Sequence, residues 1–146
     1  MIDRSWIGRE LGQAVLPIEA GRLKFFAKSI GEANPIYSDE AAARAAGYAA
    51  LPAPPTFLFA ASLDSGVVFQ MLEEMQVPIG KILHGEQAFE YLAPIVAGDV
   101  ITVRSKVSNI YDKKNGALEF IEIVQEAENQ DGVRVAEIRN ITVVRN

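Results

Sequence analysis

A chain of 146 residues has the length of one domain, so we expect residues 1–146 to form a single folded domain. Its 19 acidic and 14 basic residues give a net charge of −5, which argues against a protein that tracks nucleic-acid phosphates. The absence of cysteine excludes disulfides and thiolate metal sites, and with a single histidine we expect no metal. The N-terminus has no apolar signal core, and proline breaks the longest apolar runs. We therefore expect a soluble, cytoplasmic protein without a membrane partner.

Two helices are predicted in the first third of the chain. Apolar side chains recur at helical spacing in residues 19–32, namely Leu23, Phe26, Ala27 and Ile30. Gly31 is placed to end this helix. Ser38 is predicted as the N-cap of a second short helix, because two acidic residues follow it in the first turn and Gly47 comes after its end.

The segment 54–76 predicts one long central helix. It is apolar nearly all round from Phe57 to Met71, and a helix with that pattern is buried rather than lying on a surface. Pro54 and Pro55 suit a first helical turn, where their missing N–H groups would be unpaired anyway. Its predicted core residues are Phe57, Phe59, Val68 and Met71.

After residue 80 the pattern changes to strands. Segments 81–94 and 98–112 are rich in strand-forming residues, and the second places three apolar side chains on one face, Ile101, Val103 and Val107. Asn-Gly at 115–116 and Asp-Gly at 131–132 predict hairpin turns before two further strands. We therefore predict an α+β protein of the hot-dog kind, in which a curved antiparallel β-sheet wraps a long buried central helix.

The stretch IGEANPIYSDE resembles the hydratase motif of MaoC-like (R)-specific enoyl-thioester hydratases and 3-hydroxyacyl-thioester dehydratases. That motif reads Gly-Asp-x-Asn-Pro-(aliphatic)-His-x-Asp and precedes a helix. LPAPPTFLFAASL is similar to the start of the family's central helix, and AFEYLAPIVAGDVITVRSKV is similar to its strand signature. The resemblance spans Trp6 to Arg145, and three blocks in this order are specific. It implies an acyl-thioester substrate, with coenzyme A or acyl carrier protein present as part of that substrate and no other cofactor.

Three positions depart from the family's motif. Glu32 stands at the aspartate position and is one methylene too long, although Asn34 is retained. Tyr37 stands at the histidine position, and a phenol with an ordinary pKa of about 10 is a poor base at neutral pH. The family's Ala-His-Gly-Met aligns with Ala53 to Thr56, so Pro55 removes the amide that the resemblance implies as the oxyanion donor. These losses indicate that the chain does not perform the chemistry alone.

The sequence is most similar to the non-catalytic subunits of heteromeric dehydratases, on the segments NPIY, APPTF and ILHGEQAFEY. This resemblance implies a subunit that shapes the acyl channel while a hot-dog partner with an intact Asp/His motif supplies the chemistry. A second copy of the chain is the alternative partner, because the exposed edge of a hot-dog sheet needs to be covered.

Two other functions are compatible with the sequence. The first is a self-sufficient homo-oligomeric hydratase that uses Glu32 and His84, and the second is a non-enzymatic module that binds acyl thioesters. His84 is the only histidine, and a lone histidine at a strand start is more often structural. Gln87, with its neighbour Glu86, breaks the apolar alternation of its strand, which indicates a polar pocket or an interface. The candidate substrate-binding residues are Thr56, Phe57, His84 and Gln87.

Overall fold

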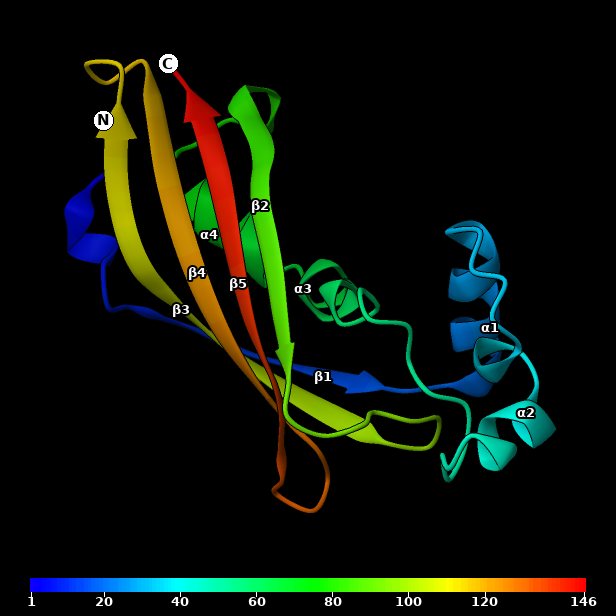
Figure 1. The fold of residues 1–146 in the computed structure, drawn as a ribbon. Coiled ribbons are helices and arrows are strands. Elements are labelled where there is room, and N and C mark those ends of the chain that lie inside the picture. Colours follow the sequence, from blue (N-terminus) through cyan, green and yellow to red (C-terminus); the bar gives the residue numbers. More distant parts are fainter.

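The computed structural model describes residues 1–146, and its centre is a single antiparallel sheet (Figure 1). The strands lie in the order β1-β3-β4-β5-β2. Their bounds are β1 Glu10–Pro17, β2 Ile82–Tyr91, β3 Val100–Lys113, β4 Leu118–Glu128 and β5 Arg134–Arg145. The helices are α1 Ala20–Ser29, α2 Glu40–Ala45, α3 Phe59–Ser65 and α4 Val67–Glu74, with short 3-10 turns η1 Arg4–Trp6, η2 Pro35–Tyr37 and η3 Ile79–Lys81. No helix has the length and apolar character needed to cross a membrane.

The predicted meander is confirmed in β3, β4 and β5. These strands follow one another along the chain and pair as antiparallel neighbours. Asn115 and Gly116 have φ angles of 54° and 83° in the first turn, and Gly132 has a φ of 74° in the second. Positive φ values are what such tight turns require, and Asn and Gly tolerate them best.

Strand β1 was not predicted from the sequence. It pairs with β3 at one edge of the sheet, with only Ala14 and Leu16 of its eight residues buried. A bulge with Gly12 at φ 89° shifts the register near its start. A short strand with two buried side chains leaves too little alternation to detect, and the free edge of β3 is what holds it extended.

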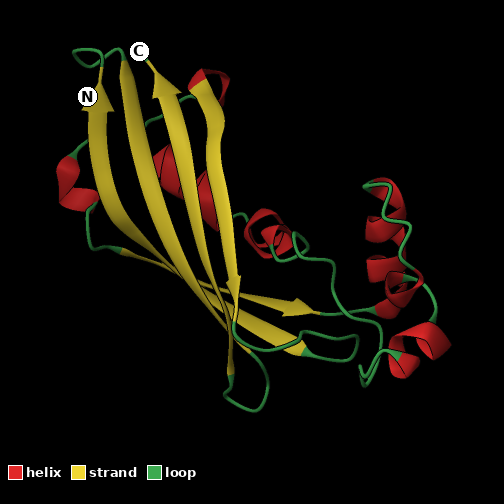
Figure 2. Cartoon of the chain, viewed as in Figure 1, coloured by secondary structure: helices red, strands yellow, loops and turns green.

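The central helix is not continuous, which corrects one detail of the predicted fold. Gly66 has a φ of 69° and separates α3 from α4. A left-handed glycine ends a helix because its backbone cannot continue the right-handed turn. The two prolines lie before the helix rather than in it, since the Pro54 carbonyl accepts the Phe57 N–H in a turn and α3 begins at Phe59. Figure 2 shows α4 behind the sheet and α3 beside the edge strand β2.

The first two helices form an arm beside the sheet, which we define as residues 20–46 (Figure 1). As predicted, α1 buries Leu23 and Ala27, whereas Ile30 is half-exposed. The N-cap of α2 is Asp39, whose Oδ1 accepts the N–H groups of Ala41 and Ala42 at 2.7 and 3.1 Å. The prediction of Ser38 was one residue off, because a carboxylate one step later can satisfy two free N–H groups.

A polar layer divides the core into two clusters. One contains Leu23, Phe57 and Ile101, and the other contains Trp6 and Ile121. Between them the buried Nε2 of Gln125 donates hydrogen bonds to the Oγ atoms of Ser62 and Ser105, at 2.9 and 2.8 Å. These three residues come from β4, α3 and β3, so their hydrogen bonds tie the helix to the sheet.

Glu119→Ala is expected to lower the free energy of unfolding by about 2–3 kcal/mol, because hydrogen bonds to a carboxylate are strong and the buried Ile2 N–H is left unpaired. The Glu119 side chain is 2% exposed, and it accepts the Ile2 N–H at 2.7 Å and the Asn146 Nδ2 at 2.8 Å. It thereby ties both chain ends to β4. Urea denaturation measures the change, and Glu90→Ala at an exposed strand position is the control. Equal losses in the two variants would contradict the assignment.

Candidate functional site

Glu32 and Asn34 build a turn on the surface. The Oε1 of Glu32 accepts the Asn34 N–H at 2.8 Å, and the Oδ1 of Asn34 accepts the Ile36 N–H at 3.2 Å, which caps η2. Both side chains are exposed. In the structure these two motif residues stabilise the local backbone, since side-chain acceptors of this kind hold a turn in place.

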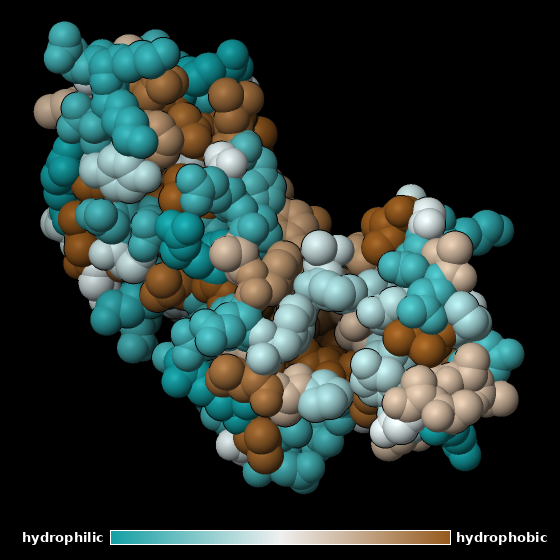
Figure 3. Space-filling model, in the orientation of Figure 1, coloured by the Kyte–Doolittle hydropathy of each residue, from teal (hydrophilic) through white to brown (hydrophobic).

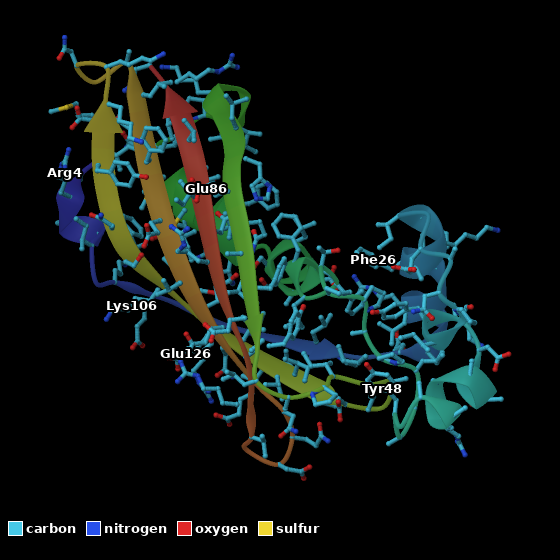
Figure 4. All side chains as sticks on the ribbon, in the orientation of Figure 1. Arg4, Phe26, Tyr48, Glu86, Lys106 and Glu126 are labelled. Carbon is cyan, nitrogen blue, oxygen red and sulfur yellow. The ribbon has the colours of Figure 1, made fainter.

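Tyr37 lies in a pocket of about 360 Å³ that contains two further tyrosines, Tyr48 and Tyr91. We call this the tyrosine pocket. Its other walls are Pro52, Ala53, Pro55, Leu92, Ala93, Pro94 and Ile95. Figure 4 labels Tyr48 at the foot of the arm, next to the chain that leads back to the sheet.

Two tyrosines of this pocket, Tyr37 and Tyr91, stay protonated at neutral pH. Burial raises the pKa of Tyr37, and the neighbouring Tyr48 and Glu32 raise it further. Burial, with a smaller contribution from Tyr37, raises the pKa of Tyr91 to about 12. A raised pKa on a phenol favours its neutral form, so neither side chain can accept a proton as a general base at pH 7.

The tyrosine pocket offers no amide at Pro55. This residue lines the pocket, and its carbonyl accepts the hydroxyl of Tyr91. The adjoining Thr56 is exposed and does not line this pocket. Proline has no N–H, so this position cannot supply the oxyanion donor that the resemblance implies there.

A second cavity of about 120 Å³ lies between the helices and the sheet. We call it the helix–sheet cavity. Helices α3 and α4 contribute mostly apolar side chains, which are Phe59, Leu63, Val68, Phe69 and Leu72, together with Ser62. Strands contribute Ile82, Leu83 and Ile123, and also five polar side chains, which are His84, Gln87, Gln125, Asn140 and Thr142.

The polar side chains of β2 and β5 form a hydrogen-bonded row. The Oγ1 of Thr142 donates to the Oδ1 of Asn140 at 3.1 Å. The Nδ2 of Asn140 donates to the Oε1 of Gln87 at 2.9 Å and lies 3.1 Å from the Nε2 of His84. The structure therefore brings together two of the predicted site residues, His84 and Gln87. Asn140 and Thr142 were missed, although a polar pair spaced by two in an apolar strand is a detectable signal.

A bulge at Gly85 makes this arrangement possible. The register of β2 against β5 shifts between His84 and Glu86. His84 and Gln87 consequently face the same cavity although they are three residues apart. Glu86, labelled in Figure 4, lies on the opposite face of the sheet, where its carboxylate pairs with Arg139 at 3.1 Å. Without the bulge, period-two alternation would put the histidine and the glutamine on different faces.

Gly85→Ala is expected to destabilise the protein by about 1–3 kcal/mol through steric overlap. A Cβ at this position would lie 2.8 Å from Val143 Cγ2 and 2.9 Å from the Ile141 carbonyl oxygen, and the backbone atom cannot simply move aside. The NMR signals of His84, the only histidine, should shift because the row that holds it is displaced. Gly80→Ala is the matched control, since its Cβ would meet no atom within 4 Å. An unchanged histidine spectrum in Gly85→Ala would contradict the role given to the bulge.

The remaining predicted site residues are placed elsewhere. Phe57 is 1% exposed in the core, with its ring edge-to-face against Phe26 at 5.3 Å, and it lines neither cavity. Glu32 and His84 share no cavity within one chain, so the structure does not assemble them as a catalytic pair. No group of three or more histidine or acidic side chains could hold a metal ion.

The helix–sheet cavity opens at the free edge of β2. Three of its apolar residues are substantially exposed: Leu63 (49%), Phe69 (43%) and Leu83 (47%). Strand β2 pairs only with β5, so its other side has no neighbouring strand. Figure 3 shows apolar atoms on the surface beside this edge, and a hollow between the arm and the rest of the chain. An unpaired edge next to exposed apolar residues is typical of a surface that another chain covers.

Residues 5–138 match the model of a family described as FAS1-like, dehydratase domain region. The chain belongs to this family. It is also 34% identical to a UPF0336 protein of Streptomyces avermitilis over 136 residues, which cover 92% of this chain and 89% of the relative. A UPF0336 protein of Thermobifida fusca is 34% identical and matches 99% of this chain and 94% of its own length.

Solved structures confirm the hot-dog fold of this dehydratase-region family member. The truncated HadBC (3R-hydroxyacyl-ACP dehydratase) complex of Mycobacterium tuberculosis contains a chain with a TM-score of 0.79 at 23% identity, covering 94% of this chain and 96% of that one. The (R)-hydratase of A. caviae has a TM-score of 0.71 at 20% identity, covering 93% and 94%. The resemblance to MaoC-like hydratases and dehydratases is therefore confirmed at the level of family and fold.

Proposed function

We propose that this chain is the non-catalytic subunit of a 3-hydroxyacyl-thioester dehydratase, or (R)-specific enoyl-CoA hydratase, of fatty acid metabolism. A partner hot-dog subunit with the intact Asp/His motif supplies the chemistry, and the helix–sheet cavity receives part of the acyl chain. One observation carries this proposal. Tyr37 and Pro55 stand at two of the motif positions, whereas an apolar cavity opens at an unpaired sheet edge.

The reaction needs acid–base groups that this chain does not assemble. Dehydration removes a proton from C2 and the hydroxyl from C3 of the acyl chain, and together they leave as water. A group with a pKa near neutrality must move these protons. Tyr37 remains protonated, and the carboxylate of Glu32 is engaged by the Asn34 N–H in an exposed turn. A partner histidine and aspartate would fill both roles, and no cofactor beyond the acyl carrier is required.

The cavity and its open rim suit an acyl chain shared between two subunits. Each buried methylene contributes about 0.8 kcal/mol, so an apolar cavity can hold a chain without charged contacts. A partner strand added along β2 would cover the exposed rim and complete the walls. The known complexes HadBC and ChsH1-ChsH2 of Mycobacterium tuberculosis, the second with a TM-score of 0.71, are named as assemblies of two different chains and support a heteromer here.

Reconstitution tests the proposal. The chain is expected to show no hydration of crotonyl-CoA or decenoyl-CoA when purified alone, and to form a stable complex with turnover once a subunit bearing the intact motif is added. Light scattering and the loss of enoyl absorbance measure the two results. Full turnover by the chain alone would overturn the proposal in favour of the self-sufficient hydratase. Tight binding of acyl-CoA without rescue by a partner would favour the acyl-thioester-binding module.

A further inference from the structure

The walls of the helix–sheet cavity differ in chemistry. The helix side is almost entirely apolar, whereas the sheet side carries the row of His84, Gln87, Asn140 and Thr142. A saturated acyl chain offers no hydrogen bonds, so any polar atom of this wall that is not paired within the row stays without a partner. An unpaired buried polar group is unfavourable, so a polar wall with such a group is not expected in a cavity that binds only hydrocarbon.

The hydrogen bonds of the row run in one direction. Thr142 donates to the carbonyl oxygen of the Asn140 amide, which therefore turns its NH₂ group toward Gln87 and His84. Gln87 accepts this hydrogen bond at its Oε1, at 2.9 Å. The Nε2 of Gln87 is consequently left as a donor, and it is the single buried side-chain nitrogen or oxygen of the protein without a hydrogen-bond partner.

An unpaired donor at the end of a directed row points to a ligand acceptor. Gln87 lines the cavity, and its side chain is positioned by Asn140 and by the Gly85 bulge in its own strand. The Nε2 is itself shielded from solvent, so a group that satisfies it must accept a hydrogen bond and reach it from the cavity as the Gln87 side chain turns. The ligand group does not need a hydrogen-bond donor, because the Oε1 of Gln87 already accepts a hydrogen bond from Asn140.

We propose, building on the proposed function, that this cavity selects acyl thioesters whose chain carries an acceptor oxygen, such as a keto group, at the depth of Gln87. The Nε2 of Gln87 donates to that oxygen, and the helix side packs the methylenes on either side of it. Gln87 is then the specificity-determining residue, while Asn140 is a positioning residue that orients its amide.

Calorimetry with two matched ligands tests this inference. Decanoyl-CoA is compared with decanoyl-CoA that carries one keto oxygen on the distal half of its chain, in a series that moves the oxygen along the chain. The wild-type chain, free and in complex with its partner, is expected to bind the best keto isomer about tenfold tighter than decanoyl-CoA, because one satisfied donor separates the two. Isomers with the oxygen elsewhere should show no gain.

Gln87→Leu and Gln87→Glu are the decisive variants. The leucine removes the donor, so decanoyl-CoA is expected to bind about as tightly as before and the keto isomer about tenfold more weakly. The glutamate keeps an acceptor for the Asn140 amide and replaces the donor by an oxygen, so it should also abolish the preference while retaining the local fold. Gln13→Leu, the same change at an exposed position of β1, is expected to keep the wild-type preference.

The outcomes separate the two proposals. Equal affinity of the wild type for all ligands, or a keto preference that survives in both Gln87 variants, would overturn the selectivity while leaving the subunit function intact. Failure of every acyl-CoA to bind, together with no rescue of turnover by a partner, would overturn the proposed function itself. A preference lost in both Gln87 variants and kept in Gln13→Leu would establish Gln87 as the selecting residue.

Discussion

Within a complex with its catalytic partner, the double variant Glu32→Gln/Tyr37→Phe is expected to keep turnover within about twofold, whereas asparagine at the partner's motif aspartate lowers kcat by about two to four orders of magnitude. The asymmetry follows from protonation and geometry. Burial raises the pKa of Tyr37, so its hydroxyl cannot serve as a base, and Glu32 holds a surface turn. Loss of a positioned acid–base group in the partner, by contrast, removes the proton-transfer step.

The measurement is steady-state kinetics on complexes of verified stoichiometry. Thermal unfolding of each complex controls for assembly, because Glu32 also caps the turn at Asn34 and its loss could loosen the arm. A hundredfold loss of kcat in the double variant, with the complex intact, would mean that the tyrosine pocket takes part in catalysis. The proposal of a non-catalytic subunit would then be wrong.

Phe57→Ala is expected to lower the free energy of unfolding by about 3–5 kcal/mol, the usual cost of truncating a buried aromatic residue. The ring is 1% exposed, packs edge-to-face on Phe26, and lies 5.5 Å from the guanidinium carbon of Arg22. It therefore joins the arm to the main core. Urea denaturation, monitored by circular dichroism, measures the loss.

Phe25→Ala is the matched control, because this neighbouring phenylalanine is 73% exposed and its loss should change stability by no more than about 0.5 kcal/mol. The pair also tests the earlier expectation that Phe57 contacts substrate. Unchanged stability of Phe57→Ala with a specific loss of acyl affinity would restore that role. A large loss of stability places the residue in the core, as the structure has it.

Local patterns predicted the elements whose partners are neighbours in the chain. Strands β3, β4 and β5 follow from period-two alternation and two glycine turns, because a hairpin pairs adjacent segments. The break at Gly66 was missed because an apolar helix pattern continues on both sides of it. Strand β1 was missed because its conformation depends on β3, whose paired residues lie far along the chain.

The candidate site divides in the same way. Residue identities at motif spacing indicated the missing acid–base pair at Glu32 and Tyr37 and the missing amide at Pro55, because chemistry of this kind depends on side-chain type. His84 and Gln87 were named as candidates, yet their partners could not be. Asn140 lies 56 and 53 residues from them in the sequence, and only the pairing of β2 with β5 brings these amides within hydrogen-bond distance.

The sequence by itself thus determined the family resemblance, the meander and the departures from the hydratase motif, all of which depend on residue type and local spacing. The tertiary structure alone decided which polar residues meet. A one-residue bulge at Gly85 reverses the alternation of side chains along the edge strand β2. As a result Gln87 lines the helix–sheet cavity, and its Nε2 has no hydrogen-bond partner. The shift is a property of the pairing with β5, which is far from β2 in the sequence and approaches Gly85 closely at Ile141 and Val143, so no pattern within β2 could reveal it.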